Sequence, residues 1–110
     1  MSDITGARRA LVARILEGDG RASLAQRRAA FDNAGLPEPL RTLIEKVAKH
    51  AYRVTDSDIA AVRASGVTEE QIFELVVCAA IGQSTRQYET AMAALDAAME
   101  RYPHAPRHPR

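Results

Sequence analysis

Apolar residues recur at helical spacing along most of the chain, and glycines and prolines separate the segments that carry them. The first segment, residues 4–17, has an apolar edge that consists of Leu11, Val12, Ile15 and Leu16. It ends at the glycines of "GDG", residues 18–20. A second helix is expected after Ser23, whose hydroxyl suits an N-cap, and Gly35 should end that helix.

The third expected helix has the clearest apolar stripe. Its residues fall at i, i+3, i+4, i+7 and i+11, which are Leu40, Leu43, Ile44, Val47 and Ala51. Pro39 suits the first turn of this helix, because its fixed φ and its missing N–H cost nothing there. The stripe therefore predicts a helix with one face in the core.

Two threonine caps predict the next helix starts. Thr55 can accept a hydrogen bond from the amide of Asp58 while the Asp58 carboxylate reaches back, and Gly66 should close the short helix that follows. Thr68 repeats this arrangement with Gln71 three residues on. These reciprocal caps fix two boundaries from local sequence alone.

The segment after Thr68 is apolar on nearly every side, which predicts a central, buried helix that breaks at Gly82. Ser84 and Gln87 offer another capping box, so a separate last helix is expected. Its apolar stripe comprises Tyr88, Ala91, Met92, Leu95, Ala98, Met99 and Tyr102. Pro103 should stop this helix, and the proline-rich residues 103–110 are expected to form a disordered tail.

These segments predict an all-α bundle of five to six helices in a single domain, residues 1–102. A chain of 110 residues leaves no room for a second core, and an aromatic content of 5% favours helix over sheet. Homo-oligomerisation would enlarge the surface that so small a chain can bury. We therefore expect a helical domain that associates with copies of itself.

Charge and cysteine content narrow the function classes. The formal net charge of +1 creates no global field toward nucleic acid or anionic lipid. One cysteine excludes an internal disulfide, and the sequence has neither zinc-ligand spacing nor a glycine-rich phosphate loop, so no metal or cofactor is expected. No apolar run is long enough to span a bilayer, and no secretory signal is recognised, which favours the cytoplasm.

The candidate chemistry lies on the central helix, where Gln71, Glu74 and Cys78 share a narrow stripe. A buried carboxylate at Glu74 could take the proton of the Cys78 thiol, leaving a thiolate that attacks a peroxide or another electrophile. Alternatively, Glu74 binds Arg86, Arg53 or a helix terminus. In that case Cys78 is a small core residue, as free cysteines commonly are.

Physical chemistry favours the core role for the sulfur, because a neighbouring carboxylate and apolar burial both raise a thiol pKa. His50 lies at the edge of the third helix's stripe and could shuttle a proton to Glu74, although a boundary histidine often binds only a carbonyl. His104 and His108 form a weak candidate for metal binding in the tail.

Basic residues cluster in the middle of the chain, and acidic residues follow them. The basic set is Arg21, Arg27, Arg28, Arg41, Lys46, Lys49 and Arg53. No aromatic residue interleaves this set to stack on bases, which argues against nucleic acid as a partner. Solvated faces, or complementary surfaces that meet between subunits, explain the two charge sets better.

The stretch "VTDSDIAAVRASGVTEEQIFELVVCAAIGQSTRQYETAMAAL", residues 54–95, resembles the alkylhydroperoxidase AhpD-like, or carboxymuconolactone decarboxylase, superfamily. The shared pattern is a helix entering "AAVRASGVTEEQI", a long apolar helix and a final arginine-containing helix. The resemblance implies an all-α fold, obligate homo-oligomers and, in the peroxidases, a CxxCxxxH redox motif before the glycine-containing turn.

That redox motif is missing from this chain. Counting back from Gly66, its two cysteines and its histidine correspond to His50, Arg53 and Ser57. Glu38 falls roughly where the peroxidases place a proton-relaying glutamate. A dithiol cycle needs a peroxidatic and a resolving sulfur, so the resemblance supports the scaffold and not its redox chemistry.

The sequence therefore predicts an AhpD-like, homo-oligomeric scaffold without the dithiol site, which binds a small ligand or a partner or is catalytically silent. The alternative is a one-cysteine thiol peroxidase or related oxidoreductase, with Cys78, Glu74 and His50 as its catalytic residues. Decarboxylase members of the superfamily do not use the cysteine pair, so an activity of that kind stays open as well.

Overall fold

The computed structural model describes residues 2–101, with the side chains from residue 4 onward. This part of the chain is all-α: it contains five α-helices and one short 3-10 helix, which confirms the predicted fold class. Its helices are α1 (Ser2–Glu17), α2 (Leu24–Asp32), α3 (Leu40–Lys49), η1 (Ala51–Arg53), α4 (Asp56–Ala64) and α5 (Glu69–Arg101). The predicted tail, residues 103–110, lies outside the described residues.

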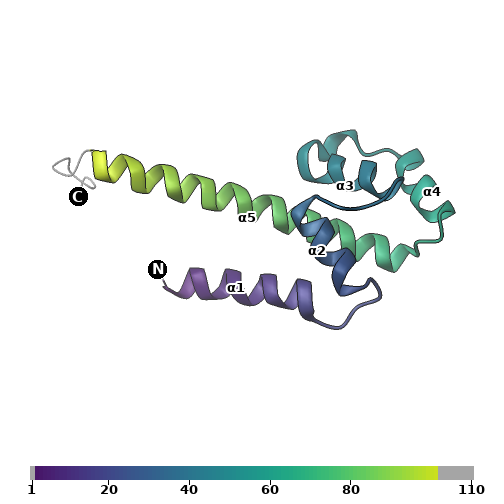
Figure 1. Cartoon of the computed structure of the whole chain (residues 1–110), viewed down its shortest axis with the longest axis horizontal. Coiled ribbons are helices and arrows are strands. Elements are labelled where there is room, and N and C mark those ends of the chain that lie inside the picture. The colour runs from purple at the N-terminus through teal and green to yellow at the C-terminus, as the bar shows by residue number, and fades with distance from the viewer. Residues whose placement is uncertain (1, 102–110) are drawn as a thin grey trace.

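The short helices gather around one end of α5 (Figure 1). α2, α3 and α4 surround the half of α5 that begins at Glu69, and α1 runs antiparallel to α5, with Ile15 near Cys78 and Arg8 over the Tyr88 ring. The other half of α5, from Ser84 to Arg101, extends away from α2, α3 and α4. We call this half the arm.

Three of the four predicted caps are present. Thr55 and Asp58 form the capping box that begins α4, and Ser23 forms one with Gln26 that begins α2. At the start of α5, the amide of Gln71 donates to Thr68 Oγ1 at 3.2 Å, and the amide of Thr68 donates to Gln71 Oε1 at 2.9 Å. All three boundaries depend on side chains three residues apart, which explains why sequence alone predicts them.

The predicted break at Gly82 is wrong, because α5 is one continuous helix of 33 residues. Gly82 is buried, and a Cβ atom there would overlap the carbonyl oxygen of Phe31 at the end of α2. The glycine therefore allows two helices to approach closely instead of ending one of them. Ser84 caps nothing: its hydroxyl donates to Ile81 O at 3.1 Å within the helix.

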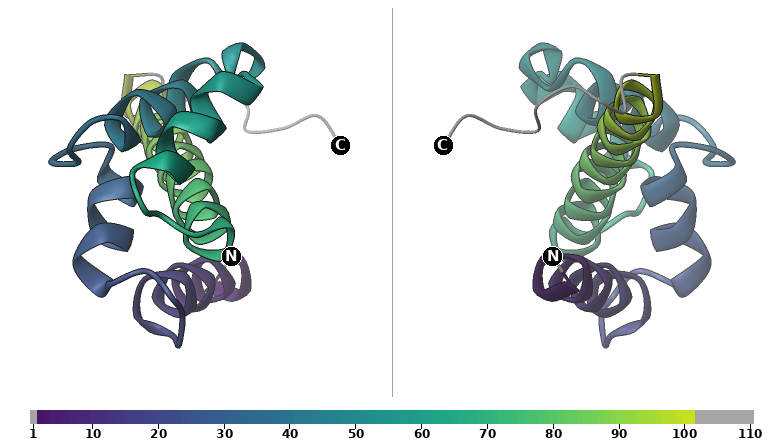
Figure 2. Two further views of the ribbon diagram at one scale, coloured as in Figure 1. Left: turned by 90° about the vertical axis from the view of Figure 1, so that its right-hand side faces the viewer. Right: turned by 90° about the vertical axis from the view of Figure 1, so that its left-hand side faces the viewer.

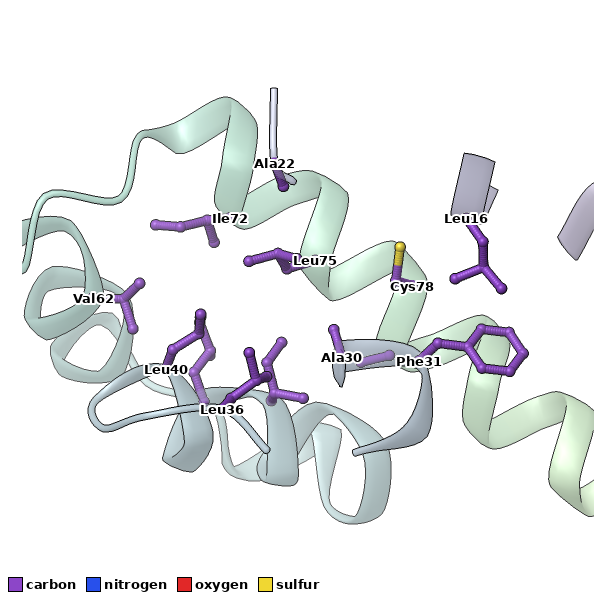
Figure 3. Packing of buried hydrophobic residues seen from close by; sticks show 13 residues of the cluster. Leu16, Ala22, Ala30, Phe31, Leu36, Leu40, Val62, Ile72, Leu75 and Cys78 are labelled. Atoms are coloured by element: carbon purple, nitrogen blue, oxygen red, sulfur yellow. The ribbon is translucent and has the colours of Figure 1, made fainter. Parts of the chain in front are cut away.

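The core lies between α5 and the three short helices (Figure 3). Leu43, Ile44, Val62, Leu75 and Cys78 are the largest fully buried side chains. The third helix's stripe is confirmed at Leu40, Leu43 and Ile44, whereas Ala51 lies exposed in η1. These contacts fix the first half of α5 on which the candidate residues lie.

The central helix is less buried than its sequence predicts. Phe73 is 70% exposed, and the side chains that enter the core from this segment are Ile72, Leu75, Cys78 and Ala79. One side of α5 is therefore packed while another side remains open, although both are apolar.

Candidate functional site

Cys78 lies inside the core, where α5 passes the end of α1. Its side chain is 1% exposed, and its Sγ lies 3.9 Å from the carbonyl oxygen of Ile15. Figure 3 shows the sulfur beside Leu16 of α1. Burial raises the pKa of the Cys78 thiol, and the charge of Glu74 raises it further, while Arg27 opposes them. The thiol is therefore protonated at neutral pH and shielded from solvent.

Glu74 binds backbone amides and no arginine side chain within hydrogen-bonding distance in the described part of the chain. Its Oε2 accepts from Arg21 N at 2.7 Å, and its Oε1 accepts from Arg21 N at 3.0 Å and from Ala22 N at 2.9 Å. Burial alone would raise the pKa of Glu74, but these amide hydrogen bonds and the charge of Arg27 hold it below its usual value. Glu74 is thus an ionised anchor for the loop that precedes α2.

The predicted stripe of Gln71, Glu74 and Cys78 faces one stretch of chain, from the end of α1 to the start of α2. Gln71 Nε2 donates to Arg21 O at 3.2 Å, and Glu74 accepts from Arg21 N. The two side chains therefore bind both the carbonyl and the amide of Arg21. Of the partners predicted for Glu74, a helix terminus is nearest to what is observed, because α2 begins two residues after Ala22.

Arg27, which the sequence places in a run of basic residues, is buried with only 6% of its surface exposed. Its Nε donates to Ala22 O at 3.2 Å, and its Nη1 donates to Gly18 O at 2.6 Å and to Ile15 O at 3.3 Å. The guanidinium satisfies carbonyls at the C-terminal end of α1, which have no partner within that helix. One signal existed in the sequence: Arg27 lies on the same face of α2 as Ala30 and Phe31.

Arg86 holds the other end of α2. Its Nη1 donates to Phe31 O at 2.6 Å, and its Nη2 donates to Gln83 Oε1 at 3.1 Å. The same carbonyl faces Gly82, so α5 meets the C-terminus of α2 through a glycine and an arginine one turn apart. Arg86 was a candidate partner of Glu74, but it binds this carbonyl instead.

His50 is not brought to Glu74 or Cys78. It is the exposed C-cap residue of α3, where its backbone N–H bonds Lys46 O, and its ring meets Tyr52 edge-on with 6.0 Å between centroids. No hydrogen bond joins it to Glu74 among the described residues. The structure thus assembles two of the three predicted catalytic residues, one helical turn apart, and leaves His50 outside their surroundings.

Glu38 is also occupied by local contacts. Its Oε1 accepts from Thr42 Oγ1 at 2.7 Å and from Thr42 N at 3.1 Å. The side-chain hydrogen bond from Thr42 lowers the pKa of Glu38. An ionised, exposed carboxylate with these partners stabilises the first turn of α3.

Members of the basic set have separate partners. Lys46 Nζ binds both carboxylate oxygens of Asp58, at 3.0 and 2.9 Å, and this contact lowers the pKa of Asp58. Arg28 pairs with Asp32, and Arg41 donates to Leu36 O. These residues are therefore distributed among helix ends and ion pairs.

An open groove of about 620 Å³ runs between α1 and the first half of α5. Its walls include Leu11 and Arg14 of α1 and Phe73 and Val77 of α5, with Arg27, Glu74 and Cys78 among the lining residues. The volume lies within the range of small-molecule sites. Its walls are largely apolar, and Leu11 and Phe73 at its sides are exposed.

The described residues contain no group of three or more His, Cys, Asp or Glu side chains that could hold a metal ion. Within residues 2–101, none of the helices has both the length and the apolar character needed to cross a membrane. Searches against protein families, curated proteins and solved structures return no match to this chain.

Proposed function

We propose that this protein is an AhpD-like, homo-oligomeric helical scaffold without the dithiol site, and that it works by binding. The observation that carries this proposal is the exposed apolar face of the arm. Tyr88, Met92 and Leu95 lie on that face and are all exposed, and Leu95 has the largest exposed fraction of the three, 51%. A helix that presents large apolar residues to water over several turns is typical of an interaction surface.

The rest of the molecule agrees with a binding role. Leu11 and Ile4 of α1 are exposed as well, and Leu11 shares a groove with Phe73 and Val77, so exposed apolar surface is found on both helices. The groove between α1 and α5 adds a concave apolar surface. Either a small ligand or the surface of another chain would find its contacts in this groove, and self-association would cover the face of the arm.

Thiol chemistry receives less support. A one-cysteine peroxidase needs a thiolate that peroxide can reach, whereas Cys78 is buried and its pKa is raised by that burial. Glu74 is already held by the amides of Arg21 and Ala22, so its carboxylate is not directed at the sulfur. Binding is therefore the better proposal.

The test is the mass of the protein in solution by size-exclusion chromatography with light scattering. We expect the wild type to have a multiple of the 12.0 kDa chain mass at micromolar concentration. Leu95→Asp should shift it toward the monomer, because a charge would be buried in the contact. Ala97→Asp places the same charge on nearly the opposite face of the arm and should leave the mass unchanged. A monomeric wild type would overturn the proposal.

A further inference from the structure

One face of α5 remains uncovered along most of the helix, and Arg8 of α1 reaches it at the Tyr88 ring. Its residues are exposed or half-buried, and they recur at helical spacing: Phe73, Val77, Ala80, Ser84, Tyr88, Ala91 and Leu95. We call this set the open face. α2 lies on another side of α5, and Figure 2 shows no described helix on the flank opposite α2.

The open face is symmetric about Ser84. Its other members lie 4, 7 and 11 residues before Ser84 and 4, 7 and 11 residues after it. An 11-residue spacing departs by only about 20° from whole turns of a straight α-helix, so Phe73, Ser84 and Leu95 point in nearly the same direction. A single straight helix therefore presents all seven residues to one partner.

Such symmetry makes the face complementary to itself. In an antiparallel pair with its two-fold axis at Ser84, Phe73 meets Leu95 of the partner subunit. Val77 then meets Ala91 of the partner subunit, and Ala80 meets Tyr88 of the partner subunit. Two of these three pairs combine a larger with a smaller side chain, which lets the helices interdigitate. Ser84 meets its own copy, where small side chains allow the closest approach.

We infer that two copies of the chain associate through an antiparallel α5 pair centred on Ser84. The inference rests on the proposed homo-oligomer and specifies its contact. The partner's arm would lie beside Phe73 and Val77 and fill the groove that these residues form with Leu11. Each subunit would thus supply an arm for the other subunit's groove.

Length and charge agree with this arrangement. Ser84 lies near the middle of Glu69–Arg101, so the arm matches the packed half of α5 in length. Antiparallel pairing places the acidic first turn, with Glu69 and Glu70, near Arg101 of the partner subunit. It also opposes the two helix dipoles, which is favourable between adjacent helices.

The test uses disulfide cross-linking of single-cysteine substitutions on the full chain, with the buried Cys78 retained and the wild type as control. Ser84→Cys lies on the two-fold axis, so its two Cα atoms should fall within the roughly 4.4–6.8 Å that a disulfide requires. Ala91→Cys lies on the same face but off the axis, where its two copies would be about 21 Å apart along the helix.

We expect Ser84→Cys to give a covalent dimer with a copper–phenanthroline oxidant, and Ala91→Cys and the wild type to give none. A mixture of Val77→Cys with Ala91→Cys should cross-link between the two variants. Equal cross-linking of Ala91→Cys alone would indicate a parallel pair and overturn the inference. If no variant cross-links while light scattering finds a dimer, the contact lies elsewhere and only this inference fails. A monomeric wild type overturns the proposed function as well.

Discussion

At the scale of single residues, two buried or half-buried charges organise the turn between α1 and α2. Arg27 donates to two carbonyls of this turn and to one in the last turn of α1, and Glu74 accepts from two amides of the turn. Gly20 lies against Glu74, where a Cβ atom would come within 2.7 Å of Oε1. The turn thus replaces the hydrogen bonds that its backbone would otherwise make with water.

Glu74→Gln tests this role. Glutamine keeps one oxygen that can accept from Arg21 N and Ala22 N, but its Nε2 takes the place of the second oxygen and sets a donor against the amide of Arg21. The negative charge is lost as well, so we expect a loss of about 1 to 2 kcal/mol in the free energy of unfolding at pH 7. Glu70→Gln, one turn earlier and exposed, should change it little. Urea denaturation measures both, and equal stability of the two variants would contradict the anchor role.

The effect of Glu74→Gln should depend on pH. The folded pKa of Glu74 is lowered, so the carboxylate contributes its full stability above the unfolded pKa, about 4.3. That contribution is lost as the pH falls from there through the folded pKa. The difference between wild type and Glu74→Gln should therefore shrink in acid.

Part of this site follows from the sequence alone. Helical spacing placed Gln71, Glu74 and Cys78 on one stripe, because 3.6 residues per turn is a local property. It did not show what faces the stripe, since the segment between α1 and α2 lies about 50 residues away in sequence. Arg27 was missed because burial of a guanidinium depends on carbonyls that only the folded chain brings together.

At the scale of elements, three helix starts were predicted correctly and the continuity of α5 was not. Thr55, Thr68 and Ser23 bond residues three positions away, which sequence spacing reveals. Gly82 has the same local signature as a helix break. Its actual role comes from Phe31, which is distant in sequence, so the contact that decides it is tertiary.

Gly82→Ala tests that role. Alanine favours an isolated helix by about 1 kcal/mol, but its Cβ would overlap the Phe31 carbonyl, and overpacking typically costs about 1–3 kcal/mol. We expect net destabilisation in thermal or urea unfolding. Gly6→Ala in α1 is the matched control, because nothing lies within 4 Å of its Cβ position, and it should stabilise or be neutral. Stabilisation by both substitutions would contradict the close approach.

At the scale of the whole molecule, the chain is elongated. Its radius of gyration is 17.6 Å, against about 13 Å for a compact domain of this length. α5 alone spans about 50 Å, and beyond the bond from Arg86 to Phe31 O the arm extends away from α2, α3 and α4. Such a shape leaves apolar surface in water unless another chain covers it.

Association that buries this apolar surface makes the thermal stability of the protein depend on its concentration. If copies associate through the arm, the melting temperature of the wild type should rise with protein concentration by mass action. Leu95→Asp should melt at a temperature that is nearly independent of concentration. Differential scanning calorimetry over about a hundredfold range of concentration measures both. A flat wild-type profile would count against self-association.

Because α5 continues without a break past Gly82, a small rotation of the helix there produces a larger displacement at its C-terminal end. About 28 Å of helix separate Gly82 from Arg101, so a tilt of about 10° at the glycine would swing the tip of the arm by about 5 Å. The contact between Gly82 and Phe31 therefore sets the direction of the arm. A small change in the distance between α2 and α5 would produce a larger displacement at the tip of the arm. A side chain in the packed half of the protein can thus redirect surface that it never touches.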